Sequence, residues 1–125
     1  MKADVKVVEI NGVEYVPKDS VNTQQKAEEL DGMEYVIVRT YSAGVFAGFL
    51  AEENGKEVVV KQARRLWYWK GAASLSQLAT DGTKDPNSCK FPCAVNSIKL
   101  KEAIEIISCT KTAKKSIEEV AIWKS

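Results

Sequence analysis

Apolar and polar residues alternate along residues 5–16, around an Asn-Gly dipeptide. Asn-Gly favours the positive φ angles of a tight hairpin turn, so this pattern predicts a β-hairpin. The polar segment that follows predicts a helix from about residue 19 to residue 30, with Gly32 as its stop. Few residues of this segment are apolar, so the helix has little surface with which to pack on a core.

Strand-forming residues become dense after residue 33. Residues 34–40 are rich in β-branched and aromatic types and predict one strand, and residues 45–51 predict a second. Another Asn-Gly turn leads into a third predicted strand, from residue 57 to about residue 69. Because thirteen residues are long for one strand, we expect a bulge near Ala63-Arg64. The order of these segments predicts an antiparallel meander.

A Ser-x-x-Gln pattern at residues 74–77 predicts a helix N-terminus, because the serine and glutamine side chains can satisfy unpaired backbone N–H groups there. The helix is expected to end at Asp81-Gly82, with Leu78 on its buried face. Residues 81–93 contain two prolines and form the longest irregular segment. Loops of that length often carry function.

The last part of the chain predicts two strands and a helix. Residues 95–100 and 103–109 are apolar enough for strands, although the residues between them could equally turn helically. Beyond them, apolar residues fall at helical spacing, and Ser116 opens a Ser-x-x-Glu capping pattern. Trp123 is expected to pack this C-terminal helix onto the sheet.

The length and the apolar content indicate one domain. The chain has 125 residues, of which 45% are hydrophobic, which suffices for one compact core and hardly for two. We therefore predict a single α+β domain. Its N-terminal hairpin and helix occupy residues 1–32, and an antiparallel β-sheet meander with short flanking helices occupies residues 33–125.

The charge balance limits the classes of partner. Eighteen Lys and Arg stand against seventeen Asp and Glu, so no overall field attracts a nucleic acid polymer or an anionic membrane. Any anion site must be local. The N-terminus lacks the apolar stretch of a signal peptide, and no apolar run approaches the roughly 20 residues that span a bilayer. We expect a cytoplasmic protein.

The residue types favour binding over catalysis. Histidine is absent, which removes the commonest general base and a common metal ligand. Cys89, Cys93 and Cys109 are most simply free thiols, because a zinc site would need a fourth ligand. No paired-carboxylate or Ser-Lys pattern stands out. We expect no enzyme, no metal and no cofactor.

A run of basic and aromatic residues is the most unusual feature of the sequence. It comprises Arg64, Arg65, Leu66, Trp67, Tyr68, Trp69 and Lys70. If the run is extended, each of its two faces pairs one arginine with aromatic area, which suits a nucleotide phosphate and base. The alternative is that the tryptophans belong to the core and the arginines extend from a sheet edge.

Two further segments have weaker signals for a phosphate or a ribose. Residues 40–44 form a small-residue turn whose hydroxyl and N–H groups could approach a ligand closely, although a plain turn explains them equally well. Residues 110–115 place three lysines at the expected start of the last helix, where the helix dipole disfavours cations unless an anion is bound. A solvated basic turn is the alternative there.

Three stretches resemble the phage anti-Thoeris proteins. From residue 34 the order is Glu-Tyr-Val-Ile-Val-Arg-Thr-Tyr-Ser-Ala-Gly-Val-Phe-Ala-Gly. Residues 63–72 read Ala-Arg-Arg-Leu-Trp-Tyr-Trp-Lys-Gly-Ala, and Leu-Ser-Gln-Leu follows at residues 75–78. With the segment 103–123, the resemblance covers roughly residues 33–123, and its Arg-Leu-Trp-Tyr-Trp core is the specific part.

The resemblance implies a molecular sponge in the cytoplasm of an infected bacterium. Such proteins bind glycocyclic ADP-ribose, the signal made by TIR-domain proteins of Thoeris defence, and hold it intact so that the effector is not activated. Members of the family are also expected to form homo-oligomers and to have room for the cyclic oligonucleotide signals of CBASS defence. The phage counter-defence function is thus an expectation from the resemblance alone.

Candidate ligand contacts follow from the chemistry of the matching segments. The phosphate candidates are Arg64, Arg65, Lys111 and Lys115. The stacking candidates are Trp67, Tyr68, Trp69 and Phe91. The candidates for ribose hydroxyls or the base edge are Ser42, Asn96 and Thr110. The expected ligand-binding set also includes Arg39, Ala43, Gly44 and Lys70.

Two other classes of function stay open at this point. One is a nucleotide-degrading enzyme that acts through a carboxylate such as Glu34 or Glu57. The other is a protein-interaction module in which Trp67 and Trp69 anchor a partner, since Trp and Arg are enriched at interface hot spots.

Overall fold

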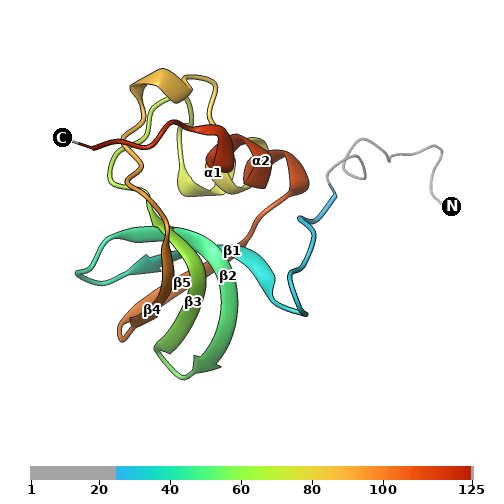
Figure 1. Ribbon diagram of the computed structural model, residues 1–125, viewed down its shortest axis with the longest axis vertical. Helices are drawn as coiled ribbons and strands as arrows, with labels where there is room; N and C mark the ends of the chain where they lie inside the picture. The colour runs from blue at the N-terminus through green and yellow to red at the C-terminus, as the bar shows by residue number, and fades with distance from the viewer. Residues whose placement is uncertain (1–24, 125) are drawn as a thin grey trace, which may run out of the picture.

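The computed structural model describes residues 25–124, and they form an α+β domain with one antiparallel sheet and two helices (Figure 1). The strands are β1 (Glu34–Thr40), β2 (Val45–Asn54), β3 (Glu57–Arg65), β4 (Val95–Leu100) and β5 (Ala103–Ser108). The helices are α1 (Leu75–Asp81) and α2 (Lys111–Glu119), with a short 3-10 turn at Pro86–Ser88. The predicted fold class and antiparallel meander are confirmed. The predicted hairpin at 5–16 lies outside the described residues.

The order of the strands forces the sheet to curl. The five strands pair in the order β4-β3-β2-β1-β5, so β4 and β5 lie at opposite edges of the sheet. Only Lys101 and Glu102 separate these two strands along the chain. A link this short brings the two edges towards each other, and Val38 of β1 and Leu100 of β4 accordingly share one apolar cluster.

The concave side of the curled sheet has its own core, which no helix covers. Its fully or nearly buried members are Val36, Val38, Phe46, Val58, Val60, Ala63, Leu100 and Ala103. Along β1 they alternate with Tyr35 and Ile37, which belong to the core under the helices, as the pleat of a strand requires. The central part of the sheet therefore buries both of its faces, whereas the edge strands β4 and β5 are largely exposed.

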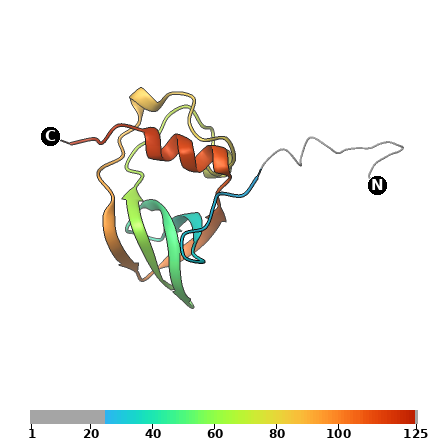
Figure 2. The same ribbon diagram turned by 45° about the vertical axis from the view of Figure 1, so that its right-hand side comes forward.

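Both helices cover the opposite face of the sheet, as the two views show (Figures 1 and 2). This larger core joins Tyr35 and Ile37 of β1 to Leu78 of α1 and Ile117 of α2. At this end of the domain the chain ends of the strands and the loops around the helices come together. The residues that can form a ligand site are concentrated here.

A bulge interrupts β3 next to the predicted position. The register of β2 against β3 shifts between Ala47 and Phe49, opposite Gln62, which has a φ of 50°. The strand then ends at Arg65 instead of continuing to residue 69. The ladder stops there because β2 begins at Val45 and β4 at Val95, and beyond Leu66 the described residues supply only an isolated bridge, between Tyr68 and Lys90.

The predicted N-terminal helix is wrong for residues 25–30, which are not helical. This segment runs extended, with Lys26 bridged to Thr110 and the Ala27 N–H donating to the Cys109 carbonyl at 3.0 Å. A polar sequence with few apolar positions has no stripe to bury as a helix, whereas extended backbone buries Ala27 alone. The portion of this helix before residue 25 lies outside the described residues.

The helix at the C-terminal end begins at Lys111, within the expected start at residues 110–115, and the capping pattern at Ser116 does not mark its N-terminus. Thr110 caps α2, because its hydroxyl accepts the Ala113 N–H at 3.0 Å, whereas Ser116 lies inside the helix. Trp123 lies beyond α2 and is exposed, so the prediction that it packs the helix onto the sheet is wrong.

The cap of α1 is as predicted, with the Ser74 hydroxyl accepting the Gln77 N–H at 3.1 Å. Among residues 25–124, no helix is long and apolar enough to cross a membrane.

Candidate functional site

Arg64 is buried and holds three segments together. It is 7% exposed, and its guanidinium donates to the backbone carbonyls of Phe91, Pro92 and Ile117 at 2.8–2.9 Å. Burial lowers the pKa of the guanidinium below its ordinary value. Ile117 lies in the last turn of α2, where carbonyls lack helical partners and attract a cation. The scaffold role that the sequence left open for the arginines therefore describes Arg64.

Arg65 points to the opposite side of β3. Its guanidinium lies over the Phe46 ring, 4.4 Å from the centroid, and Nη1 donates to the Ala43 carbonyl. Gly44 adopts a φ of 102°, and a Cβ there would lie 3.4 Å from Arg65 Nη1. Arg65 and the turn thus approach each other. Arg65 lines a cavity of about 220 Å³ whose lining also includes Cys93 but no residue of the turn.

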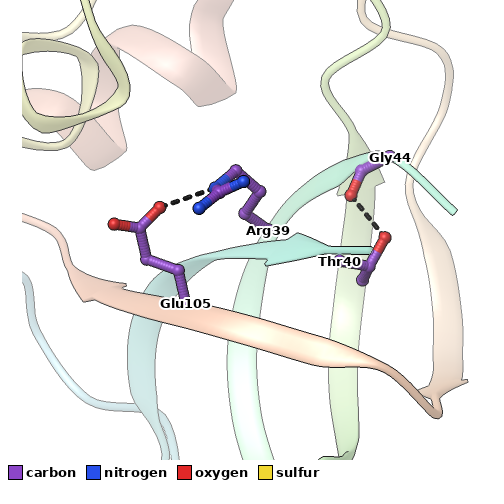
Figure 3. A network of polar contacts seen from close by, with 4 residues as sticks. All are labelled: Arg39, Thr40, Gly44 and Glu105. Carbon is purple, nitrogen blue, oxygen red and sulfur yellow. Dashed lines mark hydrogen bonds and ion pairs between the residues drawn. The ribbon is translucent and has the colours of Figure 1, made fainter. Parts of the chain in front are cut away.

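Polar groups of the turn at residues 40–44 bond mainly to one another. Thr40 Oγ1 donates to the Gly44 carbonyl at 2.8 Å, and Arg39 Nε pairs with the Glu105 carboxylate at 2.8 Å (Figure 3). The Ser42 hydroxyl donates to the Glu102 carboxylate at 3.0 Å. The expected ligand contacts in this region therefore already have protein partners.

The aromatic candidates separate into exposed and buried residues. Trp67 and Tyr68 are 62% and 47% exposed, whereas Trp69 packs partly against the core that the helices cover. The Lys90 ammonium lies 5.9 Å from the Tyr68 ring centroid. Phe91 is completely buried, so the prediction that it stacks on a base is wrong. Its apolar ring fills the core beside the Arg64 guanidinium, which the loop composition around it did not indicate.

A hollow lies between α2 and the loop that follows α1. We call it the α2 groove, and its volume is about 530 Å³. It is lined by Thr83, Pro86, Thr112, Lys115, Ser116 and Glu119. Four of these six residues lie on α2, at positions that recur with helical spacing. Of the predicted site residues, Lys115 belongs to this groove.

A close backbone approach builds the α2 groove. Gly82 ends α1 with φ 76° and ψ −160°, a conformation open essentially to glycine alone. A Cβ on Gly82 would lie 2.3 Å from the Ser116 Cβ. The Thr83 N–H donates to the Ser116 hydroxyl at 3.0 Å, and the Thr83 hydroxyl donates to the Lys70 carbonyl. Loop and helix are therefore locked together at the base of the groove.

Lysines and glutamates together flank the groove. Lys115 also lines an adjoining cavity of about 180 Å³, together with Lys111, Lys114, Glu28 and Glu118. Lys114 pairs with Glu118 at 2.8 Å, while no described carboxylate lies within 4.0 Å of the Lys111 or Lys115 ammonium. Both of these lysines were predicted phosphate contacts, and the structure brings them to one rim.

Thr110 has a structural role beside this groove. Besides capping α2, its hydroxyl donates to the Thr80 carbonyl at 2.6 Å, which ties α2 to α1. The sequence prediction missed Thr83, Thr112, Ser116 and Glu119 as groove residues. The spacing of the last three along α2 was a signal for one helix face, but nothing in the sequence indicated that residues 82–86 pack beside it.

The remaining candidates lie apart from the α2 groove. Asn96 is exposed on β4, and Lys70 is exposed before α1. Glu34 accepts the Ser108 hydroxyl at 2.5 Å and pairs with Lys26 at 3.0 Å, and these contacts lower its pKa. The structure therefore gives Glu34 an ion-pair role.

The cysteines are free, as predicted. Cys89 and Cys109 are buried and Cys93 is exposed. Burial raises the pKa of the Cys109 thiol to about 12, so this thiol stays protonated at neutral pH. Within the described part of the chain, no three His, Cys, Asp or Glu side chains are grouped to hold a metal ion.

Comparison with known families finds one match. A family described as a domain of unknown function, DUF6948, matches residues 33–117. The matched span contains all five strands, α1 and most of α2, including Lys111 and Lys115. No curated protein and no solved structure matches the chain.

Proposed function

This chain belongs to the DUF6948 family, a domain of unknown function, and we propose that it is a sponge for a cyclic ADP-ribose-type nucleotide bound in the α2 groove. The resemblance to phage anti-Thoeris proteins supplies the ligand class, glycocyclic ADP-ribose. The protein would act in the cytoplasm of an infected bacterium and withhold this signal from Thoeris defence. It would release the nucleotide unchanged.

The observation that carries this proposal is the size and chemistry of the α2 groove. Its volume of about 530 Å³ falls in the range of roughly 300–1,000 Å³ that is usual for sites of small organic ligands. The Arg65 cavity, at about 220 Å³, is smaller than that range. A nucleotide with two sugars and two phosphates therefore fits the groove better than the site favoured by the sequence alone.

The groups around the groove match the parts of such a nucleotide. The Lys111 and Lys115 ammonium groups would meet the pyrophosphate, since neither has a described carboxylate partner. The Thr112 hydroxyl and the Glu119 carboxylate would bond to ribose hydroxyls. Both lysines lie in the first half of α2, where the helix dipole also favours a bound anion.

The base is the part of the ligand that the groove serves least. Its lining contains no aromatic side chain, and the saturated ring of Pro86 is the only ring among the six residues. The exposed aromatic residues Trp67 and Tyr68 are the remaining stacking surfaces of the original set. We propose that a homo-oligomer brings these rings from a second copy to the base.

A release experiment tests the sponge proposal. Purified protein is mixed with glycocyclic ADP-ribose, freed of unbound nucleotide, and denatured, and the released nucleotide is quantified by mass spectrometry. The proposal expects about one unchanged nucleotide per site. Destruction of excess nucleotide by catalytic amounts of protein would support a degrading enzyme instead. If the protein neither retains nor destroys the nucleotide, both the sponge and the degrading enzyme are refuted.

A specific surface favours a second candidate function, a protein-interaction module. Trp67, Tyr68, Ile122 and Trp123 are all large and exposed, and interface hot spots are enriched in such residues. Thermal melting separates the two candidates. A tightly bound nucleotide raises the melting temperature by mass action, whereas a module that binds only protein shows no shift with either the cyclic ADP-ribose or the CBASS cyclic oligonucleotides.

A further inference from the structure

A second hollow lies on the Arg64 side of β3, apart from the α2 groove. Its volume is about 240 Å³. It is lined by Tyr35, Gln62, Arg64, Ala94, Glu118, Val120 and Ile122. Tyr35, Arg64 and Val120 are buried, while the other four are exposed, so the first three form its base and the others its mouth. We call it the Tyr35 cavity.

The base of the Tyr35 cavity holds polar hydrogens without protein partners. Tyr35 is 4% exposed, and its hydroxyl has no hydrogen-bond partner among residues 25–124. Its ring is fixed edge-on against Phe49, with centroids 5.1 Å apart. A buried hydroxyl without a partner is unfavourable, so the site gains from any acceptor that enters.

Arg64 adds further donors at the same base. A guanidinium carries five N–H groups, and three of them bond to the carbonyls of Phe91, Pro92 and Ile117. Among the described residues, no carboxylate lies within 4.0 Å of Arg64 to balance its charge. Two N–H groups and one buried positive charge therefore remain for a ligand.

The walls and the mouth favour a small ligand of single negative charge. Val120 and Ile122 offer an apolar surface for a compact ring or chain. The Glu118 carboxylate at the mouth is paired with Lys114 at 2.8 Å, so its remaining repulsion is smaller for a group with one negative charge than for a group with two, such as a phosphate monoester. Gln62 is directed there by the β3 bulge, in a left-handed conformation (φ 50°) that is uncommon for a residue other than glycine.

We propose that the Tyr35 cavity is a binding site for a small monocarboxylate with an apolar body. The carboxylate accepts from the Tyr35 hydroxyl and from the free N–H groups of Arg64, and the body packs on Val120 and Ile122. Benzoate has this chemistry and a size that suits the cavity. The site is separate from the α2 groove and uses none of its residues, so either proposal can fail without the other.

Titration of the nucleotide-free protein with benzoate tests the site. The chemical shifts of the protein are followed by NMR, and benzamide serves as an uncharged probe of nearly the same shape. We expect saturable binding of benzoate with a dissociation constant near 1 mM or below, and at least roughly tenfold weaker binding of benzamide. Equal and non-saturating shifts with both probes would mean an adventitious additive only and would overturn the proposal.

A matched pair of tyrosine variants assigns the binding to Tyr35. Tyr35→Phe retains the ring contact with Phe49 and removes the hydroxyl, so benzoate should bind roughly tenfold more weakly. Tyr41→Phe makes the same change at a residue that is highly exposed, and should bind benzoate like the wild type. Equal binding by all three proteins would overturn the proposal.

Stability and the Gln62 position give independent readouts. Removal of an unpaired buried hydroxyl should leave the melting temperature of free Tyr35→Phe protein unchanged or higher, whereas a hydroxyl with a structural role would lower it. Gln62→Gly should raise the melting temperature, because glycine accepts a φ of 50°, and should weaken benzoate binding by removing the side chain at the mouth. Unweakened benzoate binding in Gln62→Gly would contradict the assigned mouth.

Discussion

Two cation-bearing regions that share α2 differ in how much of the cation the fold itself uses. At the junction of Arg64 with Phe91, Pro92 and Ile117, the cation is buried and three of its N–H groups bond to backbone carbonyls. In the α2 groove, Lys115 is exposed and has no described carboxylate partner. The difference teaches that burial and partner count, and not the charge alone, decide how much a cation contributes to the stability of the fold and how much of its binding capacity is left for a ligand.

The strongest challenge to this comparison is Arg64→Ala. It removes three charge-assisted hydrogen bonds at the edge of the core and leaves the Pro92 carbonyl without a described partner, while the Phe91 and Ile117 carbonyls still accept the N–H groups of Trp123 and Val120. We therefore expect a loss of about 3–5 kcal/mol in the free energy of unfolding. Chemical denaturation followed by fluorescence measures it. Arg39→Ala is the control, because its exposed ion pair with Glu105 should contribute below about 1 kcal/mol. Similar losses in both variants would end the distinction.

Gly82→Ala tests how the groove is built. The new Cβ would lie 2.3 Å from the Ser116 Cβ, on a backbone conformation that disfavours alanine, so we expect a loss of about 3 kcal/mol. Thermal unfolding measures the change. Gly55→Ala also meets a positive φ but has nothing within 4 Å, and should cost about 1 kcal/mol. A smaller loss at Gly82 than at Gly55 would show that loop and helix are not locked.

Lys115→Ala tests the exposed side of the comparison. Loss of one charge-assisted contact should weaken binding of glycocyclic ADP-ribose roughly tenfold to a hundredfold, as measured by calorimetry, while the free energy of unfolding stays within about 0.5 kcal/mol. Lys99→Ala, on exposed β4, should change neither quantity. If Lys115→Ala binds with wild-type affinity, the groove does not hold the phosphates as proposed.

The smallest expected effect concerns the partly exposed ion pair between Glu34 and Lys26. The hydroxyl of Ser108 and the charge of Lys26 lower the pKa of Glu34 below its ordinary value of 4.5. The resulting stabilisation is present above that value and is lost as the pH falls through the lowered pKa of the folded protein. Glu34→Gln should therefore melt below the wild type at pH 7, by a margin that shrinks as the pH falls below 4.5. A margin that stays constant over this pH range would contradict the assignment.

Local patterns predicted the fold well where a segment makes its own structure. The β-branched run of β1 (Glu34–Thr40) and the serine cap of α1 were placed correctly, because each signal lies within a few residues of the element it defines. The prediction for residues 25–30 failed because that segment is held extended by the Thr110 region, more than 80 residues later. Such a tertiary contact leaves no local pattern.

The site was less predictable than the fold for the same reason. The alternation of a strand correctly separated Arg64 from Arg65, but not which of the two faces was buried. That depends on α2, whose Ile117 carbonyl lies 53 residues from Arg64 in sequence. Lys115 was singled out by its charge near a helix start, whereas the loop that completes its groove was not.

The two-residue link between β4 and β5 has a consequence for the order of folding. Strand β1 is paired on one side with β2, its neighbour in sequence, and on the other side with β5, where Val36 faces Ser108. During synthesis, that second edge of β1 has no partner in the sheet until β5 (Ala103–Ser108), which begins more than 60 residues after β1 ends, has been made. Closing such a long loop is slow, and an unpaired edge rich in valine and isoleucine invites association with other chains. The last strand therefore protects the first.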